Sequence, residues 1–369
     1  MRTSACLAED EFWIRKALQL ARRGEGRTRP NPPVGAIVVR NGRAVGSGYH
    51  RRAGGAHAEV LALRQAGPRA RNAALYVTLE PCCTWGRTGP CTDVILASGI
   101  RRVVVSVTDP NPRHRGRGIR ILREKGLVVT CGVCREAGER LLAPFAKWIT
   151  TRTPYLTLKM GMTLDGRIAD GVGRSRWITG PSSRRMVQQM RRRADAVLVG
   201  GGTARIDNPS LLGSGNSFLR RITVDSSLRL PLDAKMLNDG FASQTIVATT
   251  GRSPAQRRRR YEAKGATVWV LPVERGQVSL RSLLRRLGSE GFLHVLCEGG
   301  GELAARLIQQ RLVDRFVFFV AGKILGPGAV PIVGGGGWPL ATAPEVAFVG
   351  VGRCGSDLFL EAKPSVRGK

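Results

Sequence analysis

The sequence has few of the residues on which several classes of protein depend. Aromatic side chains make up only 5% of the 369 residues, too few for the stacking surfaces that bind single-stranded nucleic acid. No apolar run approaches the roughly 18 residues of a membrane-spanning helix, and Phe316–Gly322 is typical of the longest. The eight cysteines are irregularly spaced, which excludes the framework of a small disulfide-rich domain. These absences favour a globular protein with reduced cysteines and no membrane partner.

Acidic residues are scarce, but Glu9, Asp10 and Glu11 stand where a signal peptide would need its apolar stretch. We therefore expect a cytoplasmic protein. The hydrophobic share of 42% and the charged share of 23% are those of an ordinary folded chain. A length of 369 residues exceeds the size of about 250–300 residues at which single hydrophobic cores stop growing. The sequence therefore predicts two domains.

Positive charge dominates the composition. The chain has 59 Lys and Arg against 27 Asp and Glu, a net charge of +32, and only nine of the cations are lysine. Such a field attracts nucleic acid or phosphorylated small molecules. The alternative is a general bias towards arginine, in which runs such as Arg191–Arg193 and Arg257–Arg260 are solvated helix faces. We favour the bias because these runs are scattered along the chain, and the charge alone does not decide the function.

Hydrophobic periodicity predicts an α/β unit in the first part of the chain. Strands are expected at Val34–Val39 and Arg43–Tyr49, joined by an Asn41-Gly42 turn that is a strong hairpin signal. Helices and further strands follow as far as a helix at about Glu136–Ile149. The segment Thr150–Pro154 then forms a plausible boundary, which divides the chain into predicted domains 1–150 and 151–369.

A second series of strands begins at Tyr155. The expected strands include Tyr155–Lys159, Ala196–Val199 and His294–Cys297, and helices such as Ser183–Arg193 separate some of them. Strands that alternate with helices favour a mainly parallel, doubly wound sheet.

A candidate metal site lies in the first part. His57 and Glu59 open a predicted helix, Cys82 follows a predicted strand, and Cys91 begins the next helix. One imidazole and two thiolates would give Zn²⁺ three protein ligands and leave the fourth position for water, as in catalytic zinc sites. Helix N-termini favour the thiolate over the thiol. Glu59 would then carry the proton from that water to a departing amine.

Each of these features has a simpler interpretation by itself. A His-x-Glu pair is more often a solvated helix start, and a cysteine after a strand is usually a core residue. Together they partly match the zinc nucleobase-deaminase pattern, in which the second cysteine follows the first by three residues. Here Trp85 holds that place, and Cys91 lies nine residues after Cys82. The separate Cys131–Cys134 motif has no second pair of ligands, and we interpret it as structural.

Two glycine clusters, Gly200–Thr203 and Gly299–Gly301, follow predicted strands of the second part. The second cluster leads into an amphipathic helix whose free N–H groups can hold a phosphate. Neither cluster is the G-x-G-x-x-G fingerprint of dinucleotide-binding folds. Two interpretations therefore remain: a nicotinamide-cofactor site, or only a tight connection between a strand and a helix.

Longer segments carry a resemblance to a known family. The stretch Glu80–Cys91 resembles the metal loop of the bifunctional riboflavin-biosynthesis deaminase/reductase family. In the first part, further similar segments are Asn31–Gly35, Gly46–His50, His57–Glu59, Asp109–Pro112 and Gly116–Gly118. In the second part they are Lys159–Gly161, Leu164–Arg167, Ser175–Thr179, Val199–Thr203, Asp207–Leu211, Val224–Ser226 and Glu298–Gly301. The resemblance spans roughly Glu11 to Leu358.

The resemblance implies a cytidine-deaminase-like α/β/α domain followed by a dihydrofolate-reductase-like α/β domain. In the first domain it implies zinc ligation by His57, Cys82 and Cys91, with Glu59 as the catalytic proton shuttle. It implies contacts to a pyrimidine nucleotide from Asn31, His50 and Arg87.

In the second domain the resemblance implies sites for NADPH and for the deaminated substrate. The NADPH site would comprise Gly161, Trp177, Thr203, Asp207, Ser226, Gly300, Gly301, Glu302, Leu303, Ala304, Ala305 and Arg306. The substrate site would comprise Lys159, Ser175, Arg191, Leu211 and Glu298. The planar fork of Arg191 suits a phosphate. Lys159, Asp207 and Glu298 are all candidates to supply the proton that accompanies the hydride, and the sequence does not choose among them.

The chain departs from the family pattern in two places. Thr84 stands where the family usually has a histidine, and the preceding Cys83 is a potential competitor for the metal. Ser214 stands where the family usually has an arginine. Arg220 or Arg221 is a candidate replacement for that arginine.

The sequence therefore predicts a bifunctional enzyme of riboflavin biosynthesis. Zinc-dependent hydrolytic deamination of a diaminohydroxyphosphoribosylaminopyrimidine would precede NADPH reduction of the ribosyl side chain to ribityl. Two alternatives stay open: a deaminase with a degraded reductase half, suggested by Ser214, and an RNA-binding or RNA-editing zinc deaminase, suggested by the charge. The expected partner is a small phosphorylated pyrimidine, without nucleic acid, and the sequence leaves a homo-oligomer open.

Overall fold

A computed structural model describes residues 4–86, 88–213, 215 and 218–365 of the chain. The chain divides into two units between Arg152 and Thr153. Helix α5 spans Arg135–Thr151, so Thr150 and Thr151 form its last turn and the division comes just after it. Each unit has its own sheet and its own hydrophobic core.

The first unit is built on a five-stranded sheet in the order β2-β1-β3-β4-β5. Its strands are β1 (Gly35–Arg40), β2 (Arg43–Tyr49), β3 (Ala74–Leu79), β4 (Arg102–Val107) and β5 (Val128–Cys131). Strand β1 is antiparallel to both β2 and β3, whereas β3, β4 and β5 are parallel. The predicted hairpin turn is present, with positive φ angles of 50° at Asn41 and 69° at Gly42.

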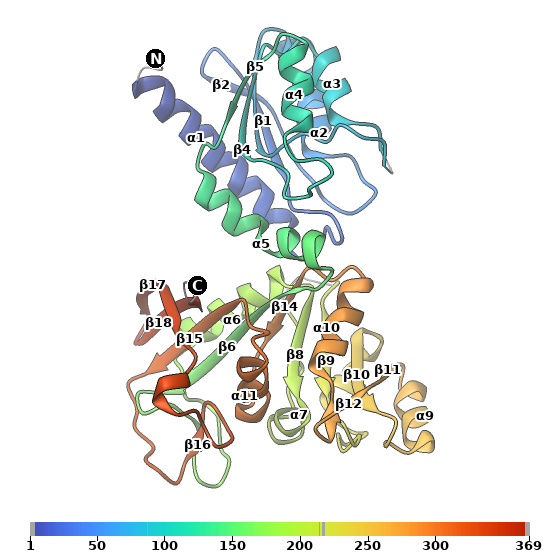
Figure 1. Ribbon diagram of the computed structural model, residues 1–369, viewed down its shortest axis with the longest axis vertical. Coiled ribbons are helices and arrows are strands. Elements are labelled where there is room, and N and C mark those ends of the chain that lie inside the picture. Colours follow the sequence, from blue (N-terminus) through green and yellow to red (C-terminus); the bar gives the residue numbers. More distant parts are fainter. Residues whose placement is uncertain (1–3, 87, 214, 216–217, 366–369) are drawn as a thin grey trace. The chain divides into compact units, whose positions relative to one another are not determined.

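Helices cover both faces of this sheet (Figure 1). Besides α5 they are α1 (Ser4–Ala21), α2 (Ala58–Ala66), α3 (Cys91–Ala97) and α4 (Arg117–Glu124), with short 3₁₀ turns at Arg22–Gly24 and Gly67–Ala70. Apolar residues of α1 and α5, such as Ile14 and Leu141, pack on one face. Those of α2, α3 and α4, such as Ala62 and Leu122, pack on the other. The expected α/β/α layers are confirmed.

Helix α2 lies unusually close to strand β2, and two glycines make this approach feasible. A Cβ at Gly46 would lie 2.2 Å from the Ala62 carbonyl oxygen, and one at Gly48 would lie 2.6 Å from that of Ala58. No larger side chain fits there, because real Cβ atoms do not approach backbone oxygens so closely. The two glycines therefore fix the position of the helix that begins after His57.

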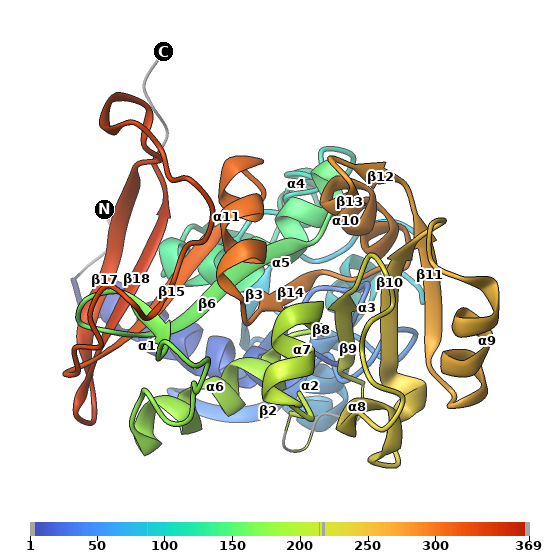
Figure 2. The same cartoon turned by 90° about the horizontal axis from the view of Figure 1, so that it is seen from below.

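The second unit is built on a nine-stranded sheet in the order β11-β10-β9-β8-β14-β6-β15-β18-β17, which Figure 2 shows along its width. The strands are β6 (Tyr155–Thr163), β8 (Ala196–Gly200), β9 (Arg220–Val224), β10 (Thr245–Thr250), β11 (Thr267–Leu271), β14 (His294–Cys297), β15 (Arg315–Ala321), β17 (Val346–Cys354) and β18 (Asp357–Pro364). All neighbours from β11 to β15 are parallel. The hairpin β17–β18 adds an antiparallel edge that the sequence did not predict.

Helices cover both faces of this sheet as well, which confirms the doubly wound arrangement. They are α6 (Pro181–Arg193), α7 (Gly201–Asp207), α8 (Lys235–Asn238), α9 (Ala255–Ala263), α10 (Leu280–Ser289) and α11 (Gly301–Gln309). The short elements are β7 (Arg167–Ala169) paired with β16 (Val330–Pro331), β12 (Val273–Glu274) paired with β13 (Gln277–Val278), and 3₁₀ turns at Ala242–Gln244 and Leu340–Thr342. Leucines of α10 and α11 pack on one face. Residues of α6 to α9, such as Tyr261, pack on the other. Within the described residues, no helix combines the length and the hydropathy required to cross a bilayer.

One arginine lies inside the core of the second unit. The Arg221 side chain is 0% exposed. Its Nη1 donates to the carboxylate of Asp239 at 2.5 Å and to the Ser210 carbonyl at 2.9 Å, and its Nη2 donates to the carbonyls of Met236 and Phe241 at 2.8 and 2.6 Å. These four bonds join strand β9 to the segments around α8.

Replacement of Arg221 by methionine is expected to destabilise the second unit by about 3–5 kcal/mol, because it leaves three carbonyls and the Asp239 carboxylate, which is only 18% exposed, without their donor. The neighbouring Arg220 is only half-buried, and its guanidinium donates to the Ser243 carbonyl. Arg220→Met is therefore the matched control and should cost far less. Urea denaturation followed by circular dichroism measures both, and equal losses would contradict the structural role of Arg221.

Candidate active sites

The first candidate site is a cavity of about 390 Å³ in the first unit. It lies where strand β3 ends and where helix α2 begins. Its lining residues are Pro30, Asn31, Pro32, Val34, His50, Gly54, Gly55, His57, Glu59, Leu79, Glu80, Cys82, Thr84, Gly86, Thr88, Asp109, Phe145, Trp148 and Ile149. The carboxyl ends of parallel strands are the usual location of ligand sites in α/β sheets.

Three potential metal ligands converge at this cavity. His57 is the N-cap of α2, Cys91 is the first residue of α3, and Cys82 follows the end of β3. The Nδ1 atom of His57 lies 3.1 Å from the Cys91 sulfur and 3.5 Å from the Cys82 sulfur. All three ligand atoms lie within 4.8 Å of one another. An ion bound about 2.0–2.3 Å from each atom fits this spacing, as zinc does with nitrogen and sulfur ligands.

The surroundings prepare these side chains for a metal. Hydrogen bonds from the Cys91 thiol, from His57 and from the Cys91 backbone N–H lower the pKa of the Cys82 thiol despite its burial. The thiolate is the form that binds zinc. The other ring nitrogen of His57 lies 3.4 Å from the Thr88 hydroxyl, so the ring turns Nδ1 towards the sulfurs. Such an outer partner is typical of metal-binding histidines.

Glu59 lies beside the three ligands and is not one of them. Its side chain is 3% exposed and lines the cavity. Burial raises the pKa of this carboxyl to about 7, and the nearby Cys82 sulfur adds to the effect. A group with a pKa close to neutrality is suited to take up and release a proton in turn.

Asn31 and His50 form a hydrogen-bonded pair on the cavity wall. The His50 Nδ1 lies 3.2 Å from the Ala56 carbonyl oxygen, so this nitrogen must carry the proton and donate it. The His50 Nε2 then accepts an N–H from the Asn31 amide at 3.1 Å. Burial lowers the pKa of His50, which keeps the ring neutral. Both residues line the cavity, and their contact with a substrate remains a prediction.

The remaining predictions for this unit divide into three kinds. Thr84 lines the cavity, whereas Cys83 is not among the three residues of the metal group found within the described residues. Arg87 lies outside the described residues. Cys131 and Cys134 are both free cysteines, and they belong to no such group in the described part of the chain.

Sequence reasoning missed several cavity residues. Asp109 lines the cavity from the loop between β4 and α4, and Glu80 lines it from the end of β3. Phe145, Trp148 and Ile149 reach it from helix α5. Asp109 lies in one of the segments that resemble the family, so a signal existed. The α5 residues carried none, because their spacing is that of any amphipathic helix.

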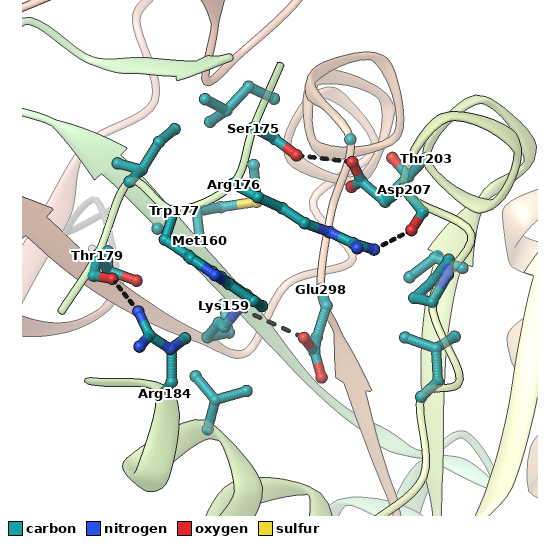
Figure 3. Close-up of a pocket in the computed structure, with 18 of the residues that line it drawn as sticks. Lys159, Met160, Ser175, Arg176, Trp177, Thr179, Arg184, Thr203, Asp207 and Glu298 are labelled. Atoms are coloured by element: carbon teal, nitrogen blue, oxygen red, sulfur yellow. Dashed lines mark hydrogen bonds and ion pairs between the residues drawn. The ribbon is translucent and has the colours of Figure 1, made fainter. Parts of the chain in front are cut away.

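The second candidate site is a cavity of about 480 Å³ in the second unit. It lies at the carboxyl ends of the parallel strands β8 and β14 and beside Lys159–Gly161 of their neighbour β6. Figure 3 shows the residues that line it. Its lining residues are Lys159, Met160, Gly161, Ile168, Ser175, Arg176, Trp177, Ile178, Thr179, Arg184, Val187, Gln188, Arg191, Val199, Thr203, Asp207, Asn208, Pro209, Ser210, Leu211, Lys235, Glu298 and Gly300. These include all five substrate residues predicted for this unit.

A buried carboxylate between two cations forms one wall of this cavity. Glu298 accepts two bonds from the Arg191 guanidinium, at 2.5 and 2.9 Å, and lies 3.4 Å from the Lys159 ammonium. Burial by itself would raise the pKa of Glu298, but Lys159 and Arg191 outweigh it and hold the pKa at about 2. The carboxyl is therefore ionised at neutral pH. The planar fork of Arg191, predicted to bind a phosphate, is directed at Glu298.

Asp207 organises another wall. It accepts a hydrogen bond from the Ser175 hydroxyl at 2.6 Å, and its backbone carbonyl accepts one from Arg176 (Figure 3). Trp177 is 62% exposed, and the Arg184 guanidinium lies 4.6 Å from its ring centroid. Arg184 also donates to the Thr179 carbonyl at 2.7 Å. An aromatic ring open to the cavity and flanked by a cation offers a flat surface to a planar ligand.

Five of the predicted NADPH residues meet in this cavity. They are Gly161, Trp177, Thr203, Asp207 and Gly300. Gly300 has a φ angle of 93°, and a Cβ there would lie 2.6 Å from the Thr203 hydroxyl. The turn therefore leaves a space that any side chain would fill, and helix α11 begins directly after it. This glycine cradle fits a dinucleotide phosphate.

The other predicted NADPH residues do not line the cavity. They are Ser226, Gly301, Glu302, Leu303, Ala304, Ala305 and Arg306. The Ser226 hydroxyl accepts the Val278 backbone N–H at 3.0 Å, and Arg306 donates to the Val278 carbonyl at 2.7 Å. Leu303 and Ala304 are buried in the core. Their contact with a cofactor remains a prediction.

Neither suggested replacement for the missing family arginine reaches this cavity. Arg221 is used in the core, and Arg220 donates to the Ser243 carbonyl. Ser214 itself lies outside the described residues. Three cations that the sequence did not single out, Arg176, Arg184 and Lys235, line the cavity instead.

Two family models match this chain. The cytidine and deoxycytidylate deaminase zinc-binding region matches residues 7–107. The RibD C-terminal domain matches residues 154–360, which is more than half of the chain. The chain belongs to the RibD family.

Named relatives agree with this assignment. The riboflavin biosynthesis protein RibD of Aquifex aeolicus is 44% identical over 322 residues, which cover 86% of this chain and 88% of that protein. RibD of Escherichia coli is 37% identical over 363 residues, which cover 95% of this chain and 98% of that protein. The solved structure of Acinetobacter baumannii RibD is 33% identical, with a TM-score of 0.86 over 98% of this chain and 100% of that one.

The structure of a diaminohydroxyphosphoribosylaminopyrimidine deaminase/5-amino-6-(5-phosphoribosylamino)uracil reductase from Thermotoga maritima also has a TM-score of 0.86 and 33% identity, over 98% of this chain and 100% of that one. Membership of the RibD family confirms the predicted class, a bifunctional zinc deaminase and NADPH-dependent reductase of riboflavin biosynthesis. Matches that extend through both halves do not favour a degraded reductase or an RNA-editing enzyme.

The metal geometry generates a direct prediction. Cys91→Ser should lower the zinc content of the purified protein well below one ion per chain, because a hydroxyl at neutral pH is a poor replacement for a thiolate. Cys83→Ser, a change of the same kind at a cysteine outside the metal group, should keep the zinc of the unmodified chain. Elemental analysis measures both, and the opposite order would reassign the second sulfur ligand.

Glu298 generates a pH prediction. Its pKa is lowered from 4.5 to about 2, so its contribution to stability is present above pH 4.5 and is lost as the pH falls through 2. Glu298→Gln should therefore be much less stable than the unmodified chain at pH 7, and the two should converge as the pH falls towards 2. Urea denaturation across this range measures the difference. The exposed Glu290→Gln is the control, and a pH-independent gap for Glu298→Gln would contradict the assigned ionisation.

Proposed function

We propose that the chain carries out two consecutive steps on one phosphorylated pyrimidine. The first unit would hydrolyse the amine of a diaminohydroxyphosphoribosylaminopyrimidine. The second unit would reduce the ribosyl side chain of the product to ribityl with NADPH. The observation that carries this proposal is the convergence of His57, Cys82 and Cys91 around one centre, with the buried Glu59 beside them.

In the deaminase step, His57, Cys82 and Cys91 would hold zinc. Zinc, when bound, supplies a water whose pKa lies near 7. Glu59 is not a ligand, so its carboxylate stays free to accept a proton and to release it to the departing amine. The neutral His50 orients the Asn31 amide, whose remaining N–H and carbonyl oxygen offer hydrogen bonds to the edge of the pyrimidine. The walls of Phe145, Trp148 and Ile149 exclude water from the ring.

In the reductase step, the glycine cradle at Gly300 and the exposed ring of Trp177 would hold NADPH, which supplies the hydride. The proton that accompanies the hydride needs a donor. Glu298 is ionised and cannot provide it at neutral pH. The Lys159 ammonium lies in the cavity next to Glu298, and we assign it the role of stabilising negative charge on the substrate oxygen and supplying the proton.

The substrate phosphate needs a cation that is not already neutralised. The Arg191 fork is engaged by Glu298. Arg184 and Lys235 both line the cavity. Within the described residues, Arg184 has no acidic partner, and the Lys235 ammonium makes no hydrogen bond or ion pair. These two side chains are therefore the proposed phosphate contacts. A cytoplasmic location and an assembly of several chains remain proposals that fit an enzyme of this class.

Turnover measurements test the whole proposal. The zinc-loaded chain should release ammonia from the diaminopyrimidine nucleotide without NADPH, and it should oxidise NADPH only when the deaminated product is present. Glu59→Ala should lower deamination by a factor of about 100–10,000 and keep its zinc, because Glu59 moves protons and does not ligate the metal.

Reduction of the deaminated product should be unaffected by Glu59→Ala. The exposed Glu136→Ala serves as the control for loss of a carboxylate in the same unit. If Glu59→Ala lost its zinc, or if it deaminated normally, the role assigned to Glu59 would be wrong.

A further inference from the structure

The loop between β4 and α4 forms part of the deaminase cavity. It contains Asp109, one of the residues that line the cavity. The Asp109 Oδ1 atom accepts the backbone N–H of Asn111 at 2.8 Å, which fixes the side chain relative to its own loop. Burial raises the pKa of Asp109. The position of this group therefore depends on where the loop itself is held.

A single buried carboxylate holds both ends of this loop. The side chain of Glu80 is 4% exposed. Its Oε2 accepts the backbone N–H groups of Asp109 at 3.0 Å and of Gly116 at 2.9 Å. Its Oε1 accepts those of Gly118 at 2.9 Å and of Ile119 at 3.2 Å. Four donors satisfy the two oxygens, which is the full capacity of a carboxylate.

The four donors come from two places. Asp109 stands at the start of the loop, whereas Gly116, Gly118 and Ile119 belong to its end and to the first turn of α4. A carboxylate that only capped the helix would need the second group alone. Glu80 bonds to both groups and so closes the loop on itself.

The same short segment carries a predicted zinc ligand. Glu80, Pro81 and Cys82 are consecutive, and the first turn of α4 packs against the first two of them. A Cβ on Gly118 would lie only 2.2 Å from the Pro81 carbonyl oxygen. The loop is thus attached to the backbone from which the Cys82 sulfur projects. The metal ligand and the Asp109 side chain share one rigid support.

We propose that Glu80 is a positioning residue of the deaminase. It holds Asp109 at a fixed position relative to the zinc ligands, so that Asp109 contacts the substrate. The proposal rests on the proposed deaminase function. Glu80 acts through its four N–H bonds and needs no contact with the reacting atoms. Its contribution should therefore depend on the presence of Asp109.

The first test is Glu80→Gln, which keeps the shape of the side chain but turns an amide N–H₂ towards backbone donors. Deamination kcat/KM should fall by about tenfold to a hundredfold, because small displacements of positioning groups have effects of this size. Zinc content should stay at the level of the unmodified chain, and so should reduction of the deaminated product. Hydrogen exchange of the segment 108–119 should become faster. Glu124→Gln, an exposed carboxylate on α4, is the control.

The second test is a double-mutant cycle with Asp109→Asn. If Glu80 acts through Asp109, the double variant should be no slower than the slower single variant. Multiplied losses in the double variant would overturn the proposal, because they would mean that the two residues act independently. Normal deamination by Glu80→Gln with accelerated exchange of 108–119 would overturn it as well.

Gly118→Ala supplies a variant that leaves the carboxylate intact. Its added methyl group must push the start of α4 away from Pro81, so it should reproduce the loss in kcat/KM even if Glu80→Gln does not fold. Normal kcat/KM in folded Gly118→Ala would overturn the proposal. Absence of deamination by the unmodified, zinc-loaded chain would instead overturn the proposed function, and it is seen before any variant is made.

Discussion

Three ligand atoms from three separate segments must lie within 4.8 Å of one another, and the first unit is organised around this requirement. Strand β3 delivers Cys82, and the starts of α2 and α3 deliver His57 and Cys91. Both helices pack on one face of the sheet, so their N-termini can meet at the end of β3. The close contact of α2 with Gly46 and Gly48 helps to set the position of His57. The zinc chemistry of this family thus depends on how closely a helix approaches a strand.

The second unit must hold three charged side chains in a partly closed cavity. Glu298 would be costly to bury alone, and Arg191 and Lys159 compensate it. The arrangement also fixes the direction of the Lys159 ammonium, which a flexible side chain in water would not maintain. One consequence is that the net charge of this cluster is small although it contains two cations. Affinity for an anionic ligand then depends on the other cations of the wall.

Much of both sites could be predicted from the sequence, because metal ligands and glycine turns stand at fixed places relative to strand ends. The strands β2 and β14 have the predicted bounds, since β2 follows the Asn41-Gly42 turn directly and β14 is a short apolar run that ends just before a glycine cluster. The partners of Arg191 and Glu80 could not be predicted. Both partnerships join segments distant in the chain, and hydrophobic periodicity contains no information about such pairs. The hairpin β17–β18 was missed because β17 is exposed along most of its length and lacks a buried face.

The burial of Arg221 changes how the unusual composition should be understood. Four acceptors surround its guanidinium from several directions, and a lysine has only three donors on one atom. On the solvated faces of α6 and α9 either arginine or lysine would serve, because water satisfies the charged group there. At position 221 only arginine can reach all four acceptors. Redesign of this protein towards a lysine-rich surface, for solubility or crystallisation, is therefore limited by geometry at the few guanidiniums that hold the chain together.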